Sequence, residues 1–177
     1  MRKKSTGFTL VELIVVVFLL GAFFSVAMPR VLKTGDMSLR SASRGIVTTI
    51  RHIYSKAIFE KRIYKLSFDI DTGEYWAEFL EENQFRLEED SASGFRKLPS
   101  GVFFSDIQTE RTQGKIGSGR DAFILFLPTG IFDSAVIHLR TGEDNFFTLS
   151  TNPYTGATKI FDEYVEFNSR FQNLAER

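Results

Sequence analysis

The hydrophobic pattern of this chain begins with a long apolar run. Residues 8–28 are almost all apolar, and Glu12 is the one carboxylate that interrupts them. Because a bilayer core about 30 Å thick needs about 20 apolar residues in helical form, the length of the run fits a membrane span. An acidic side chain inside such a span is costly and usually functional. The pattern therefore predicts a transmembrane helix with one functional carboxylate.

The next segment, up to about Arg62, repeats its apolar residues at spacings of three and four. Such spacing predicts a helix with one apolar stripe, which we expect to lie against a sheet. Residues 34–36 contain Gly35 and predict a weak break or cap before this stripe. The stripe consists of Leu39, Ala42, Ile46, Ile50, Ile53 and Ala57.

From residue 63 onward the hydrophobic period becomes two, which predicts β-strands. Strands over residues 64–70 and 75–80, joined by the turn Asp71-Thr72-Gly73, predict a hairpin. Residues 108–120 hold three glycines and few apolar residues, and we expect a mobile loop there. Further strands are expected near residues 85–87 and over residues 102–107, 122–127, 135–140, 145–151 and 158–161. One long N-terminal helix followed only by strands predicts an α+β fold.

Composition limits the possible functions. The chain has 22 Lys and Arg residues and 22 Asp and Glu residues, so its net charge is zero. Removal of residues 1–7 would leave a net charge of 19 − 22 = −3. A mildly acidic protein has no general electrostatic attraction for nucleic acid or anionic lipid. The absence of cysteine excludes disulfides, thiolate metal sites and a lipoprotein anchor. Nineteen Phe residues supply apolar material for a real core.

The start of the chain carries a specific motif. Arg2, Lys3 and Lys4 precede the apolar run, and residues 7–12 read Gly-Phe-Thr-Leu-Val-Glu. This arrangement resembles the class III leader of type IV pilins and type II secretion pseudopilins. In that family the basic leader ends in Gly, and a membrane-embedded prepilin peptidase cuts after it and methylates the new N-terminal Phe.

The resemblance implies a processing site and a domain organisation. Cleavage is expected between Gly7 and Phe8, with N-methylation of Phe8 and with Glu12 as the fifth mature residue. The implied fold is type IV pilin-like, with the long helix packed on antiparallel sheets. The implied parts are a cleaved leader (1–7), the transmembrane half of the helix (8–29), its amphipathic half (30–62) and a β-rich periplasmic head (63–177).

Physical chemistry supplies a role for the intramembrane carboxylate. Cleavage would create a free amine at Phe8, which is largely cationic at neutral pH. Glu12 lies four residues further on, about one helical turn away. The carboxylate can pair with this amine in its own chain or with the amine of a neighbouring subunit. Pairing between subunits would fix the axial register of one helix against the next.

Other readings of the N-terminus remain possible. A secretory signal peptide also has a basic start and an apolar core, and Ser25-Val26-Ala27 passes as its cleavage site. That core would be unusually long and would contain a glutamate. A plain single-span anchor with an incidental Glu12 is a further alternative.

The second half adds a looser resemblance. Residues 126–130 (Phe-Leu-Pro-Thr-Gly) and 154–157 (Tyr-Thr-Gly-Ala) resemble the C-terminal part of the GspH/FimT branch of minor pseudopilins. Residues 50–76 are similar to that branch too. The length of the chain and the order of its turns support this resemblance.

Motifs for catalysis or cofactor binding are weak. Residues 69–74 suggest a hairpin turn more than a calcium loop, because Leu80 stands where the bidentate Glu should be. Residues 114–119 are rich in glycine but lack the Gly-Lys-Ser/Thr sequence of a phosphate loop. His52 and His138 are the only histidines, and each is expected to have a surface or packing role. We therefore expect neither an enzyme nor a cofactor or metal.

The sequence thus predicts a minor pseudopilin of a type II secretion system. Its expected partners are other pseudopilins or pilins, the prepilin peptidase, the inner membrane, and the assembly platform with its ATPase. The alternative is a minor pilin of a type IV pilus, including the kind that binds DNA. Such a pilin needs a basic patch, which folding could gather from Arg111, Lys115 and Arg120. The acidic balance near the C-terminus disfavours nucleic acid, and Asp162, Glu163 and Glu166 are expected on a solvated face.

Overall fold

The computed structural model describes residues 10–90, 93–112 and 114–166, and of residues 24–36 it describes the backbone helix without side chains. The chain divides into two compact units, residues 1–36 and residues 37–177. One helix, α1 (Leu10–Glu60), contributes to both units. It runs through residues 34–36, so the break predicted there is absent. A single glycine inside a helix costs only about 1 kcal/mol relative to alanine, which the flanking turns can outweigh.

The C-terminal part of α1 presents the predicted stripe to the core. Leu39, Ala42, Ile46, Ile50, Ile53 and Ala57 are each at most 3% exposed. The helix ends at Glu60 because Lys61 adopts a left-handed conformation (φ 56°), which terminates the helical hydrogen bonds. The helical prediction is therefore confirmed to within two residues at this end.

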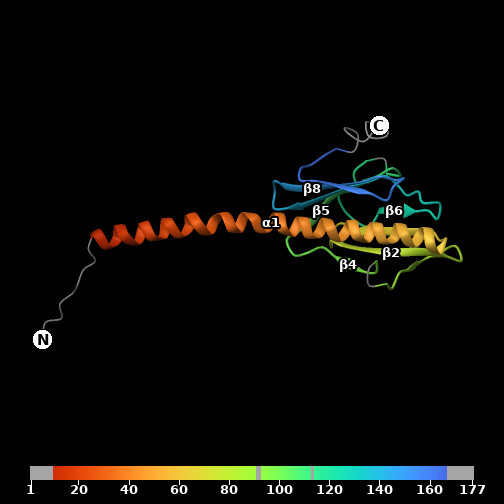
Figure 1. Cartoon of the computed structure of the whole chain (residues 1–177), viewed down its shortest axis with the longest axis horizontal. Helices are drawn as coiled ribbons and strands as arrows, with labels where there is room; N and C mark the ends of the chain where they lie inside the picture. Colours follow the sequence, from red (N-terminus) through yellow and green to blue (C-terminus); the bar gives the residue numbers. More distant parts are fainter. Residues whose placement is uncertain (1–9, 91–92, 113, 167–177) are drawn as a thin grey trace. The chain divides into compact units, whose positions relative to one another are not determined.

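Two antiparallel sheets form the rest of the second unit (Figure 1). The larger sheet has the order β3-β2-β1-β6, with β4 also paired to β2, and the smaller has the order β5-β7-β8-β9. The strands of the larger sheet are β1 (Tyr64–Asp69), β2 (Glu74–Glu81), β3 (Gln84–Leu87), β4 (Arg96–Lys97) and β6 (Ala122–Phe126). Those of the smaller sheet are β5 (Phe103–Thr109), β7 (Ala135–Thr141), β8 (Asn145–Thr151) and β9 (Thr158–Phe161).

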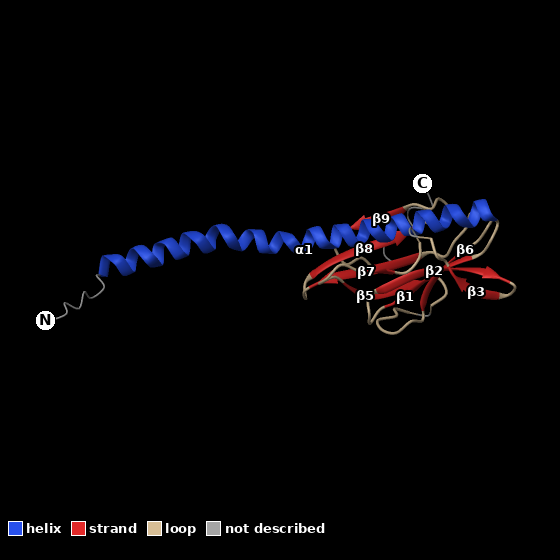
Figure 2. Cartoon of the chain, turned by 90° about the horizontal axis from the view of Figure 1, so that it is seen from below, coloured by secondary structure: helices blue, strands red, loops and turns tan. Residues whose placement is uncertain are grey.

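One hydrophobic core joins the helix to both sheets. The stripe of α1 shares a cluster with Leu66 and Ile124 of the larger sheet and with Ile137 and Leu149 of the smaller one. Figure 2 shows the strands of both sheets alongside the C-terminal part of α1. This arrangement of a long helix on antiparallel sheets confirms the predicted α+β fold.

The predicted hairpin at residues 69–74 is also confirmed. β1 and β2 pair from Tyr64↔Phe79 to Asp69↔Glu74. The Asp69 carboxylate accepts a hydrogen bond from the backbone N–H of Thr72 at 3.1 Å. Gly73 adopts φ 71°, a conformation that favours glycine. The Asp69 side chain and the glycine at position 73 therefore both favour the turn.

Candidate functional site

The residues to which the sequence assigns processing lie outside the described residues. They are Arg2, Lys3, Lys4, Gly7 and Phe8. Leader cleavage between Gly7 and Phe8 and methylation of Phe8 therefore stay predictions from the sequence.

Glu12 is the one predicted functional residue that the structure describes. It lies in the first turn of α1, and its side chain is exposed. The N-terminal end of a helix carries a partial positive charge, so a carboxylate in the first turn is favourable there. The structure thus places the Glu12 carboxylate on the surface of the helix, near its beginning. Its proposed role in setting the register between subunits remains a prediction.

The first turns of α1 present apolar side chains in all directions. Eleven large apolar residues between Leu10 and Phe23 are 44–76% exposed. They are Leu10, Val11, Leu13, Ile14, Val15, Val16, Val17, Phe18, Leu19, Leu20 and Phe23. A helix that is apolar on every side needs apolar surroundings, either lipid or other helices. This segment is therefore the strongest candidate for a functional surface in the first unit.

The predicted membrane span over residues 8–29 is only partly described. Residues 8 and 9 and the side chains of residues 24–29 lie outside the description. Among the described residues, no helix is both long enough and apolar enough to cross a membrane.

In the second unit, two turns that contain glycine pack against the side chain of Tyr54 on α1. A Cβ atom built on Gly156 would lie 2.8 Å from Cδ1 of Tyr54, and one on Gly130 would lie 3.6 Å from its hydroxyl oxygen. The Tyr54 ring also packs edge-on against Phe132, with ring centroids 5.7 Å apart. The two turns that resemble the GspH/FimT branch thus pack against α1 and hold the neighbouring strands close to the helix.

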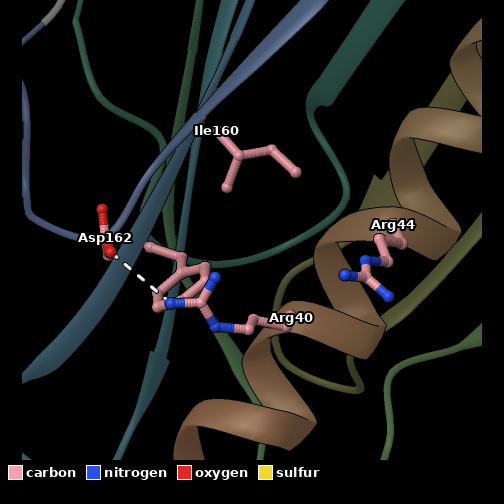
Figure 3. A pocket seen from close by; sticks show the side chains of 5 residues that line it. Arg40, Arg44, Ile160 and Asp162 are labelled. Carbon is pink, nitrogen blue, oxygen red and sulfur yellow. Dashed lines mark ion pairs between the residues drawn. The ribbon is translucent and has the colours of Figure 1, made fainter.

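A groove beside α1 combines cations with an apolar lining (Figure 3). It has a volume of about 170 Å³ and is lined by Arg40, Arg44, Phe147, Ile160 and Asp162. Arg40 pairs with Asp162 at 3.5 Å, and its guanidinium lies 5.4 Å from the centroid of the Phe147 ring. Asp162, which was predicted on a solvated face, is exposed but also contacts α1 in this way.

The three cations of the loop after β5 do not gather into a basic patch. Each binds a different carboxylate: Arg111 binds Asp133 at 2.8 Å, Lys115 binds Glu166 at 2.6 Å, and Arg120 binds Asp69 at 2.5 Å. The hydrogen bond to Asp133 raises the pKa of Arg111. These pairs anchor the loop to three parts of the head and partly neutralise the charges that a nucleic acid would need.

A polar cluster ties the segment after β3 to α1. Lys56 of the helix contacts Glu88 at 2.9 Å, Asp90 at 3.5 Å and Glu60 at 3.7 Å. His52, one turn earlier, contacts Asp90 at 2.9 Å. Burial acts to raise the pKa of Glu88, but hydrogen bonds from Lys56 and from the Asp90 backbone outweigh it and lower that pKa.

The second histidine lies in a network that the sequence did not reveal. His138 on β7 is 1% exposed. Its Nδ1 lies 2.7 Å from Oδ1 of Asp106 on β5, and its Nε2 lies 3.0 Å from the carbonyl oxygen of Val165. The Tyr164 ring stacks on the imidazole, with centroids 3.8 Å apart, and its hydroxyl donates to Asp106 at 3.0 Å. The expected packing role of His138 therefore includes hydrogen bonds at both ring nitrogens.

Both histidines contact carboxylates of other segments. Within the described residues, no group of three or more His, Cys, Asp or Glu side chains is arranged to hold a metal ion. The clusters around Lys56 and His138 instead consist of ion pairs and hydrogen bonds that connect segments of the head.

Comparisons with known proteins agree with the sequence at the N-terminus and with the fold. Residues 2–28 match the prokaryotic N-terminal methylation motif. No curated protein sequence matches the chain significantly. The resemblance of the N-terminus to type IV prepilin-like proteins is therefore confirmed by this motif.

Two solved structures of the minor pseudopilin EpsH from the type 2 secretion system of Vibrio cholerae are similar to this chain. One has a TM-score of 0.53 and 10% identity and covers 70% of this chain and 95% of its own. The other has a TM-score of 0.55 and 10% identity and covers 73% of this chain and 96% of its own. At this identity the likeness shows the fold, which is that of a minor pseudopilin.

Proposed function

We propose that this chain is a minor pseudopilin, a non-enzymatic subunit that assembles into the pseudopilus of a type II secretion system. One observation carries the proposal: a methylation motif opens an exposed apolar helix, and the same chain has a head with the minor-pseudopilin fold. In this proposal the motif directs processing by the peptidase, and the apolar helix holds the subunit in the membrane and later in the filament. The head is the part that lies outside the membrane.

The apolar helix sets the physical route of assembly. Burial of apolar surface contributes about 25 cal/mol per Å², so the exposed side chains between Leu10 and Phe23 strongly disfavour water. The mature protein would wait in the inner membrane as a single-pass protein, with its head in the periplasm. Arg2, Lys3 and Lys4 favour a cytoplasmic N-terminus before cleavage. The helix would then pass directly from lipid into a bundle of other pilin-like helices.

Several partners follow from this route. A prepilin peptidase would cut between Gly7 and Phe8 and methylate Phe8. Other pseudopilins would surround the helix in the filament. An assembly platform in the inner membrane and its ATPase would supply the work of moving the helix out of the bilayer.

Glu12 would set the register between neighbouring helices. Its carboxylate lies in the first turn of α1, and in the filament it would meet the amine at the start of an adjacent helix. An amine buried without a partner costs several kcal/mol, so the subunits would align where the amine and carboxylate meet. The same carboxylate is dispensable for insertion, because its removal makes the helix more apolar.

A minor pilin of a type IV pilus is the alternative, because its N-terminus and fold would look the same. A pilin that takes up DNA would present free cations on its head. The pairing of Arg111, Lys115 and Arg120 with carboxylates supports the secretion role over this variety.

Affinity purification of the tagged mature protein from cells that make both kinds of system would test the assignment. Recovery of other pseudopilins is the expected result. Recovery of pilus components alone would establish the alternative, and recovery of neither would contradict both.

Glu12→Val tests the assembly role separately. Cleavage and membrane insertion should be retained, because the substitution lies beyond the scissile bond, whereas cross-linking to neighbouring subunits through engineered cysteines should drop sharply. Glu12→Gln should fall between, since it keeps hydrogen bonding without charge. Wild-type cross-linking and secretion by Glu12→Val would show that this carboxylate does not set the register.

A further inference from the structure

The described end of the chain, residues 162–166, lies on one side of the smaller sheet. His138 points to this side of β7, whereas Ile137 and Leu139 on either side of it belong to the hydrophobic core. Thr148 on β8 is directly opposite His138 in the register of the two strands. The imidazole and the threonine hydroxyl both contact the segment, as does the Asp106 carboxylate of β5.

The hydrogen bonds of His138 define its protonation state. Nδ1 faces a carboxylate oxygen of Asp106, and Nε2 faces the carbonyl oxygen of Val165. Both groups are acceptors, so each ring nitrogen must carry a proton. A neutral imidazole has only one N–H, and the cation has two. Of the two charge states, only the imidazolium can donate from both ring nitrogens in this arrangement.

Asp106 supplies the opposite charge. Burial acts to raise the pKa of its carboxyl group, but hydrogen bonds from His138 and Tyr164 outweigh burial and lower that pKa. The Asp106 side chain is therefore ionised at neutral pH. The buried His138–Asp106 pair has no net charge while the imidazole is protonated and would have a charge of −1 after deprotonation.

The remaining contacts connect residues 162–166 to the same place. The Thr148 hydroxyl donates to the Glu163 carbonyl at 2.6 Å and accepts from the Val165 N–H at 3.0 Å. Lys115 pairs with Glu166 at 2.6 Å, and its ammonium lies 5.0 Å from the centroid of the Tyr164 ring. Each contact depends on the segment lying against the sheet.

We propose that His138 is the proton-operated latch of this segment: protonated, it holds residues 162–166 on the sheet, and deprotonated, it lets them go. Loss of the proton from Nε2 would leave a lone pair facing the Val165 carbonyl oxygen at a distance of 3.0 Å. Two acceptors at hydrogen-bonding distance repel one another, so the attraction becomes a penalty. Opening would uncover His138 and Thr148 on this side of the sheet.

The charged groups around the ring determine the direction of the effect. Asp106 on β5 favours the cation, whereas Lys115 opposes it and is itself paired with Glu166. Tyr164 faces the ring as a neutral phenol, since burial raises its pKa above the usual range. In the proposed latch the closed state keeps the Nε2 proton, which the open state can release, so the two states differ by at most one proton. The closed fraction must therefore fall as the pH rises, by up to tenfold in the equilibrium constant per pH unit.

Two measurements on the full-length protein in detergent micelles test the latch. Nitrogen-15 spectra of the histidine side chains report whether His138 carries one proton or two. Hydrogen exchange at the Val165 amide, corrected for the intrinsic effect of pH, reports the closed fraction. We expect two ring protons at about pH 6 and a loss of protection on the order of tenfold by about pH 8.5.

The second histidine supplies a matched control. His52→Gln removes the other titrating imidazole and should leave the pH dependence at Val165 unchanged. His138→Gln should reduce protection at about pH 6 to the alkaline level of the wild type. Tyr164→Phe removes the hydrogen bond to Asp106 but keeps the ring, so it should lower protection while retaining the pH dependence.

Clear outcomes would overturn the latch. A singly protonated His138 at about pH 6, or equal corrected protection at both pH values in the wild type, would refute it. Both of these readouts use the unaltered chain, so they decide the matter even if His138→Gln does not fold. Loss of the pH dependence in His52→Gln would assign the effect to the other imidazole.

Discussion

Gly156→Ala should destabilise the head because the structure leaves no room for a methyl group there. Gly156 adopts φ 69°, and a Cβ at this position would lie 2.8 Å from Cδ1 and 2.9 Å from Cε1 of Tyr54. Tyr54 is on α1 and also packs on Phe132, so the ring cannot move without disturbing the contact between helix and strands. The substitution thus tests the packing of this turn against Tyr54 on the helix.

The size of the effect has two parts. A left-handed conformation costs an alanine roughly 1–2 kcal/mol relative to glycine. Overpacking against a ring that is held in place adds about 1–3 kcal/mol. Gly156→Ala should therefore lower the free energy of unfolding by about 2–5 kcal/mol.

Gly142 provides the matched control. It has a similar backbone conformation, φ 65°, in the turn between β7 and β8, but a Cβ there would meet no atom within 4 Å. Gly142→Ala should cost only the conformational part, about 1–2 kcal/mol. Urea unfolding of the full chain in detergent, followed by the fluorescence of Trp76, gives both values, since Trp76 is the only tryptophan.

A double substitution isolates the steric part. If the ring of Tyr54 is the obstacle, Gly156→Ala should cost about 1–3 kcal/mol less in a Tyr54→Ala background than in the wild type. Equal costs for Gly156→Ala and Gly142→Ala, together with additive effects of the two substitutions, would refute the reasoning.

Two further predictions concern charged groups of the head. The pKa values of Glu88 and Asp106 are lowered in the folded protein, so their stabilising effect is present above the ordinary carboxyl pKa of about 4 and is lost as the pH falls below it. The melting temperature should fall by several degrees between about pH 5 and pH 3, and a constant value in scanning calorimetry would contradict this. Lys56→Met should lower the free energy of unfolding by about 1–3 kcal/mol, because it leaves the largely buried Glu88 without its cation. The side chain of Lys97, which pairs with Glu74, is 64% exposed, so Lys97→Met should lower that free energy by less than about 1 kcal/mol. Urea unfolding measures both values. Equal costs would show that burial does not strengthen the Lys56 pairs.

The fold was largely predictable because its hydrophobic periods are regular. The stripe from Leu39 to Ala57 has helical spacing, and all of its members are buried. The predicted strands over residues 145–151 and 158–161 coincide with β8 and β9. β4 was missed because Arg96 and Lys97 form a two-residue strand without alternation. A period cannot be recognised in so short a segment.

The connections within the head were less predictable, because they depend on distant residues. His138 lies 32 residues from Asp106 and 27 from Val165, so no local pattern marks their contact. The glycine turns at 130 and 156 were noted as features of a family, but nothing in the sequence indicated that Tyr54 is their common neighbour.

The basic patch that a DNA-binding pilin would need also depends on contacts that the sequence does not show. Arg111, Lys115 and Arg120 are close in sequence, which suggested that folding could bring their charges together. The backbone instead directs each of them to a different carboxylate. Proximity along the chain therefore did not determine where these side chains lie.

The proposed function depends most directly on where the mature chain begins. Intact-mass measurement and N-terminal peptide analysis of the membrane-extracted protein would determine this. The Gly7-Phe8 junction within the methylation motif predicts a chain that starts at Phe8 with a methylated amine. A mature protein that starts at Met28 would instead have been processed as a secretory precursor, which would contradict the pseudopilin assignment.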